Sequence, residues 1–107
     1  MDHEIIITSQ INKDKNKPGV TINVSGELNA TNTSTFEQEV KNIFLKEPQD
    51  IFLDLSKVTV FVSASIGSLL LMHDFVTRKN YKFQIVALNE KVKSILVVTG
   101  LDKIMVL

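Results

Sequence analysis

The fold is decided in the middle of the chain, where residues 53–70 read LDLSKVTVFVSASIGSLL. The first half of this stretch is apolar and rich in β-branched residues, which is typical of a strand. From Ser63 or Ser65 onward, apolar residues recur at helical spacing. The sequence therefore predicts a strand that leads into a helix, with small hydroxyl residues at the junction. A phosphate placed there would meet free backbone N–H groups and the positive end of the helix dipole.

The segments on either side of this junction show clear strand and helix patterns. Strands are predicted over residues 4–10, 20–25, 51–55, 83–87 and 104–107, and residues 58–62 extend or closely follow the third of them. Helices are predicted over about 32–46, from 63 or 65 to about 79, and from Asn89 to Gly100. Because residues 51–55 are almost all apolar, that strand is expected to be covered on both faces.

The predicted order of elements is β-β-α-β-α-β-α-β. An early hairpin followed by strand-helix-strand crossovers indicates an α/β fold with a mixed sheet of four to five strands and helices packed against it. A chain of 107 residues is sized for one hydrophobic core, so we expect a single domain over residues 1–107.

Composition excludes several classes of function. Twelve basic and twelve acidic side chains cancel, so no net field favours nucleic acid or an anionic membrane. The chain has no cysteine, which excludes disulfides, thiolate metal sites and a cysteine nucleophile. No signal peptide is visible at the N-terminus, and no apolar run approaches the roughly 20 residues needed to span a bilayer. We expect a cytoplasmic protein with no direct membrane insertion.

Three short motifs carry a resemblance to a known family. They are GEL at 26–28, LDLSKV at 53–58 and TGLD at 99–102. In this order they resemble the STAS domain, the fold of bacterial anti-sigma factor antagonists, and together they span nearly the whole chain. The resemblance implies a STAS-like fold. Laid without gaps on the family pattern L-D-L-S-x-V-x-x-x-D-S-x-G-L, Ser63 falls on the phosphorylated serine and Ile66 on the leucine after the glycine.

Apart from isoleucine for leucine at Ile66, the chain departs from the family pattern at two positions of this motif. Val62 stands where an aspartate usually precedes the phosphorylated serine, and its alkyl group can neither accept a hydrogen bond nor bind a cation. Ser65 replaces the usual glycine, and it can cap the helix or take the phosphate in place of Ser63. Many family members also carry a further helix after the last strand, so the surface that it covers is expected to be open here.

The resemblance also implies partners and a binding surface. The partner would be an anti-sigma factor serine kinase, which supplies ATP and Mg²⁺, so this chain needs no cofactor of its own. Binding would free the sigma factor, and phosphorylation would end the binding. Self-association into a homodimer stays open. The expected partner-binding residues are Glu27, Asn29, Val62, Ser63, Ala64, Ser65, Ile66 and Gly67.

Two alternative interpretations stand beside this one. The serines at 63, 65 and 68 are explained equally well as helix caps and small packing residues. The absence of an aspartate at Val62 favours a STAS interaction subunit of a transporter or other regulatory assembly that is not phosphorylated.

An enzyme is the least favoured class. Asp54 is expected to accept N–H groups of a turn. His73 points away from its neighbour Asp74 in a helix, and His3 lies near the terminus, so no catalytic or metal-ligating set is predicted.

Overall fold

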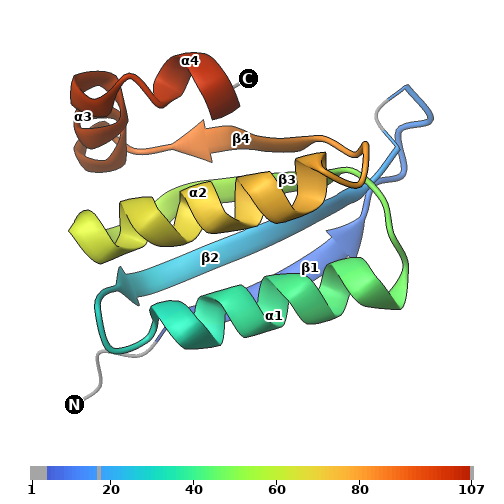
Figure 1. Cartoon of the computed structure of the whole chain (residues 1–107), viewed down its shortest axis with the longest axis horizontal. Helices are drawn as coiled ribbons and strands as arrows, with labels where there is room; N and C mark the ends of the chain where they lie inside the picture. Colours follow the sequence, from blue (N-terminus) through green and yellow to red (C-terminus); the bar gives the residue numbers. More distant parts are fainter. Residues whose placement is uncertain (1–4, 17, 107) are drawn as a thin grey trace.

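A computed structural model describes residues 5–16 and 18–106 of the chain. Its elements are the strands β1 (Ile5–Ile11), β2 (Val20–Leu28), β3 (Ile51–Phe61) and β4 (Phe83–Leu88) and the helices α1 (Thr33–Lys46), α2 (Ser63–Thr77), α3 (Glu90–Thr99) and α4 (Asp102–Met105). The strands form one sheet in the order β1-β2-β3-β4 (Figure 1). β1 is antiparallel to β2, whereas β2, β3 and β4 are parallel. The predicted α/β fold with a mixed sheet is confirmed.

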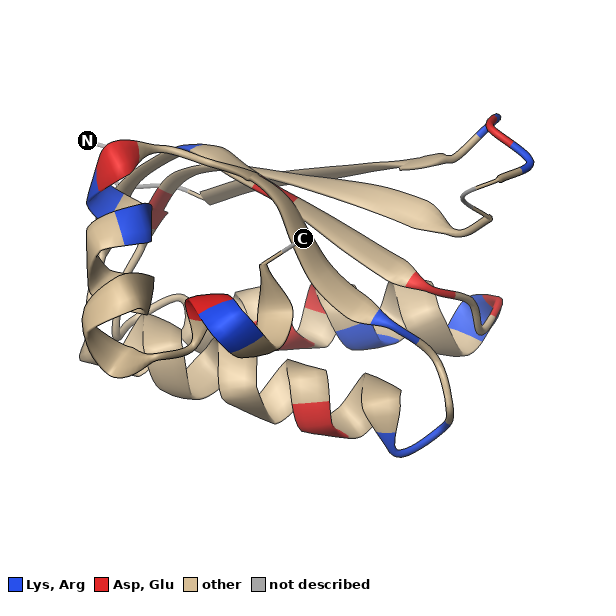
Figure 2. Cartoon of the chain, turned by 90° about the horizontal axis from the view of Figure 1, so that it is seen from above, with Lys and Arg blue, Asp and Glu red and all other residues tan. Residues whose placement is uncertain are grey.

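The helices lie on one side of the sheet, as the view in Figure 2 shows. Between the two layers lies a continuous core built from alternate residues of the strands and the buried faces of the helices. Its largest fully buried members include Phe36, Phe44, Leu53, Leu69 and Ile85. The core fixes the relative positions of α1, α2 and the carboxyl ends of β2 and β3.

The prediction that residues 51–55 are covered on both faces was wrong. Asp54 and the neighbouring β2 residues Thr21 and Asn23 are partly exposed on the face away from the helices. Phe52 is buried without a helix over it, because the end of the β1–β2 hairpin lies against its ring. A Cβ built on Gly19, whose φ is +146°, would lie 2.9 Å from the Phe52 ring and 2.5 Å from the Asp50 carbonyl oxygen.

The last segment of the chain also differs from its predicted form. Ile104 and Met105 belong to the short helix α4, and only Val106 makes a parallel bridge, with Ile85 of β4. The backbone turns again after Gly100, and the Met105 N–H donates to the Leu101 carbonyl. Leu101 and Met105 are both buried at a spacing of four residues, which is a helical pattern too short to be distinguished from a strand in the sequence. Leu107 and Glu4 lie outside the described residues.

None of the helices within residues 5–16 and 18–106 is both long enough and apolar enough to cross a bilayer.

Candidate functional site

The candidate site lies at one edge of the sheet, where β2 and β3 end and α1 and α2 begin. Parallel neighbouring strands place their carboxyl ends at the same edge, and the chain leaves each of these two strands into a helix. Leu28 and Phe61, the last residues of β2 and β3, are register partners. Two residues beyond Phe61, α2 begins at Ser63, whose side chain is exposed. The structure therefore presents Ser63 to solvent at a helix N-terminus, as the sequence predicted.

The start of α2 has no side-chain cap from the residue at the N-cap position. Val62 is in an extended conformation, with φ −126° and ψ −179°, and its carbonyl accepts hydrogen bonds from Ser65 N (2.9 Å) and Ile66 N (3.2 Å). The N–H groups of the first residues of a helix have no carbonyl partner within the helix. Ser63 and Ala64 occupy these first two positions, beside which an added phosphate would find donors.

Ser65 makes polar contacts that fix the start of α2 although Val62 provides no side-chain cap. Its side chain is fully buried, its hydroxyl oxygen accepts the Val62 N–H at 2.9 Å, and its hydroxyl proton is donated to the Leu28 carbonyl of β2. The first contact is one half of a capping box, and the second joins α2 to β2 across 37 positions of sequence. Because the hydroxyl is enclosed and used as both donor and acceptor, the geometry disfavours Ser65 as a phosphate acceptor.

Of the two other serines in the predicted cluster, Ser68 is buried and Ser63 is exposed. Ser68 is buried and donates to Glu37 Oε2 of α1 at 2.7 Å, so it joins the two helices. Ser65 and Ser68 thus have the structural roles that the alternative interpretation gave to all three serines. Within the part of the chain that the structure describes, Ser63 makes no such contact, and it remains exposed. Gly67 is exposed as well, and a methyl group added there would meet open space.

Glu27 and Asn29 lie at the same edge, at the passage from β2 into α1. The Asn29 carboxamide oxygen accepts from the backbone N–H groups of Thr31 (3.0 Å) and Asn32 (3.2 Å), and its nitrogen donates to Glu27 Oε1 at 3.3 Å. Asn32 donates in turn to the Glu27 carbonyl at 2.7 Å. These contacts hold the connection in one conformation beside the start of α2. The sequence placed both residues near the site but did not reveal this network.

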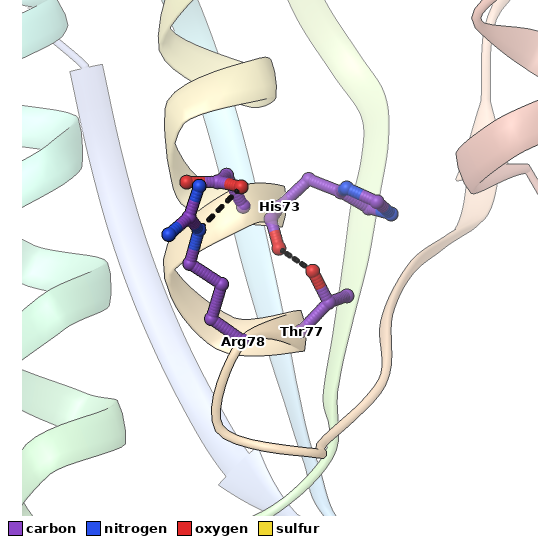
Figure 3. Close-up of polar contacts among 4 residues, drawn as sticks. His73, Thr77 and Arg78 are labelled. Atoms are coloured by element: carbon purple, nitrogen blue, oxygen red, sulfur yellow. Dashed lines mark hydrogen bonds and ion pairs between the residues drawn. The ribbon is translucent and has the colours of Figure 1, made fainter.

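The stretch of chain that contains Ser63 has no charged side chains. Residues 58–73 contain no Asp, Glu, Lys or Arg, and α2 is drawn uncharged through its first turns in Figure 2. The first charge on α2 is Asp74, whose carboxylate lies 2.9 Å from Arg78 Nε in the exposed pair of Figure 3. The hydrogen bond and charge of Asp74 raise the pKa of Arg78, which stays protonated. The start of α2 thus carries no charge of its own, whereas Glu27 lies at the same edge and Lys91 Nζ donates to the Thr59 carbonyl of β3 at 2.8 Å.

The residues considered for catalysis or metal binding have structural roles. His73 points away from the Asp74–Arg78 pair in Figure 3, and its ring packs edge-on to Phe83 with centroids 6.1 Å apart. Asp54 Oδ1 accepts from the Ser56 N–H (2.9 Å) and hydroxyl (2.6 Å), which is the structural role that we predicted, but both residues lie within β3 and not in a turn. No group of three His, Cys, Asp or Glu within the described residues could hold a metal ion. His3 lies outside those residues.

The start of α3 contributes a contact that the sequence analysis did not foresee. Asn89 Oδ1 accepts the Val92 N–H at 3.0 Å, which confirms the predicted cap. Its amide nitrogen also donates to the β3 carbonyls of Val58 (2.7 Å) and Ser56 (3.2 Å). Asparagine has donors as well as an acceptor, so one side chain both caps α3 and fastens it to β3.

Comparison with known proteins agrees with this architecture. A family model described as the STAS domain matches residues 10–107. The chain belongs to the STAS domain family. The crystal structure of TM1081 from Thermotoga maritima, described as a candidate anti-sigma factor antagonist, is 30% identical, with a TM-score of 0.76 over 94% of this chain and 84% of that one. The NMR structure of TM1081, also 30% identical, gives a TM-score of 0.78 over 100% of this chain and 84% of that one.

A second STAS-like structure is more distant in sequence. An anti-sigma factor antagonist from Mycobacterium paratuberculosis is 24% identical and has a TM-score of 0.75 over 94% of this chain and 83% of that chain. At this identity the likeness concerns the fold alone. The predicted STAS family and fold are confirmed.

Proposed function

We propose that this STAS protein is an anti-sigma factor antagonist that binds an anti-sigma factor kinase through the edge containing Ser63, and that phosphorylation of Ser63 ends the binding. The observation that carries the proposal is the position of Ser63, which is exposed at the first residue of α2 beside the ends of β2 and β3. Its family register and the candidate antagonist at 30% identity support the same assignment.

The physical effect of the phosphate follows from its position. Phosphorylation adds about −1.5 to −2 charges and three acceptor oxygens beside the N-terminus of α2. In the free chain this group would remain in solvent and be stabilised by the helix dipole, so the fold has no need to rearrange. In a complex, the phosphate would lie against the partner on an edge that carries no charge between residues 58 and 73. Its desolvation would then favour dissociation.

The roles of the two proteins are unequal in this proposal. The kinase supplies ATP and Mg²⁺, whereas this chain is ligand and phosphate acceptor and performs no chemistry. Release of the sigma factor follows because the kinase surface is occupied by the antagonist. The exchange takes place in the cytoplasm, where sigma factors act.

Phosphorylation is tested on the protein isolated from the cells that express it, with phosphatase inhibitors present. Intact-mass measurement and peptide mapping are expected to show one phosphate on Ser63 that is absent from Ser63→Ala. Thr99→Ala removes a hydroxyl away from the junction and serves as the matched control. Phosphate on any residue other than Ser63 would contradict the assignment of the acceptor.

Binding is tested with the anti-sigma factor kinases of the same organism by isothermal titration calorimetry. We expect wild type and Ser63→Ala to bind one of them and Ser63→Asp to bind at least about tenfold more weakly, because a buried carboxylate must be desolvated. Equal affinities for Ser63→Asp and wild type would argue against a phosphorylation switch.

One observation favours a second function, that of a STAS interaction subunit in a transporter or other regulatory assembly that is never phosphorylated. Val62 offers no carboxylate beside Ser63 to a kinase. This function predicts no phosphate in any growth condition and co-purification with the other subunits of an assembly.

A further inference from the structure

We infer that Val62 is a contact residue that selects an anti-sigma partner carrying an apolar group opposite the start of α2. The inference rests on the proposed function and specifies the chemistry of its interface. It concerns the N-cap position of α2, where the side chain is 37% exposed and belongs to neither the core cluster nor the residues packed against it.

Valine is an unfavourable residue for this position. An N-cap side chain of Ser, Thr, Asp or Asn accepts a backbone N–H of the first turn and stabilises the helix, which valine cannot do. Val62 makes no side-chain cap hydrogen bond. Because Val62 neither caps the helix nor fills the core, a capping residue at this position would make the protein more stable. Such local inconsistencies are expected at functional sites.

The neighbouring contacts show how the helix start is maintained without a polar residue at position 62. The buried Ser65 hydroxyl accepts the Val62 N–H at 2.9 Å and is anchored on the Leu28 carbonyl. The backbone at Val62 is thus satisfied and fixed from inside the fold. The side chain of Val62 is therefore available for contact with another molecule.

The exposed face of α2 continues this apolar surface. Helical spacing places Ser63, Gly67 and Leu70 along one side of the helix. Leu70 and Leu71 are 41% and 50% exposed, and no charged residue of α2 precedes Asp74. At Gly67 no side chain stands out, so a partner can approach the helix backbone closely. Exposed apolar groups on a stretch of helix that carries no charge of its own match an apolar partner group better than a cationic one.

The test separates binding from stability, because the two should change in opposite directions. Val62→Asp supplies the missing N-cap and is expected to raise the Tm by about 4–8 °C. The same change is expected to weaken binding of the anti-sigma factor kinase by at least about tenfold, since a carboxylate would replace a buried alkyl group. Calorimetric titration of that kinase and thermal denaturation give the two readouts.

Two further variants complete the test. Leu45→Asp places the same charge at an exposed position in the last turn of α1, whose first turn is the one near the candidate site. This variant is expected to leave the affinity unchanged. Val62→Thr keeps the shape of valine with a capping hydroxyl, and is expected to weaken binding without lowering the Tm.

Each other outcome overturns the inference in a recognisable way. If Ser63→Asp weakens binding but both Val62 variants bind as wild type does, the proposed function stands and Val62 selects nothing. If both Val62 variants lower the Tm, valine has a structural role instead. If wild type binds none of the kinases, the proposed function itself fails, and the inference fails with it.

Discussion

The starts of α2 and α3 hold a helix to the sheet in two different ways. At α3 a single N-cap residue both caps the helix and attaches it to the sheet, because Asn89 accepts from the first turn and donates to two carbonyls of β3. At α2 the corresponding contacts come from Ser65, three residues inside the helix, which binds the Val62 N–H and the Leu28 carbonyl of β2. The N-cap side chain is hydrogen-bonded within the fold at α3, whereas at α2 it is exposed. The surface that we propose for partner binding thus lies at α2 without loss of the anchor.

The largest expected effect breaks the α2 anchor. Ser65→Val leaves the Leu28 carbonyl and the Val62 N–H without their partner and adds a methyl group at a fully buried position. We expect the free energy of unfolding to fall by about 3 kcal/mol. Urea denaturation measures this loss. A fall below about 1 kcal/mol would show that the hydroxyl is not the anchor.

Breaking the α3 anchor should have a somewhat smaller effect and spare the binding site. Asn89→Ala removes the cap and the two contacts to β3, and is expected to lower the free energy of unfolding by about 2 kcal/mol. Asn89→Asp keeps the cap but loses the donors, so it should fall between Asn89→Ala and wild type. Kinase affinity is expected to be the same for all three proteins, and a loss in Asn89→Asp would extend the interface to α3.

The smallest effect is expected at the other end of α2. Asp74→Asn removes an exposed ion pair with Arg78, and such pairs in solvent contribute little to stability. The pKa of Arg78 should fall back toward its ordinary value without changing its charge at neutral pH. Thermal denaturation in low and high salt should not separate this variant from wild type. A salt-dependent loss of kinase binding would place the charged end of α2 in the interface.

Some features of these two helix starts could be predicted from the sequence. The strand-to-helix junction was predictable because apolar periodicity changes there, and Asn89 was predictable as a cap because it precedes a helical stripe. Capping and packing roles for Ser65 and Ser68 were offered only as one alternative, and their partners Leu28 and Glu37 could not be predicted, because they lie more than thirty positions away in the sequence. The sequence does not distinguish these three serines, whereas their burial in the structure does.

Errors elsewhere have the same origin. The apolar run at residues 51–55 predicted a strand covered on both faces, but Asp54 is partly exposed, and Phe52 is covered by the β1–β2 hairpin, whose position no local pattern encodes. Met105 was placed in a strand, since a short apolar segment has no readable period. Its burial against the core, together with Leu101, favours the helix instead.

The sequence by itself determined the elements from β1 to α3, their order, the STAS family and a helix start at Ser63 or Ser65, because these depend on local patterns of polarity and on motifs along the chain. Only the tertiary structure decided which serine is accessible, what replaces the missing cap at Val62 and which face of the sheet remains open. These properties depend on contacts between segments far apart in the sequence. Burial of a hydroxyl, unlike helical periodicity, is set by the neighbours that folding brings to it.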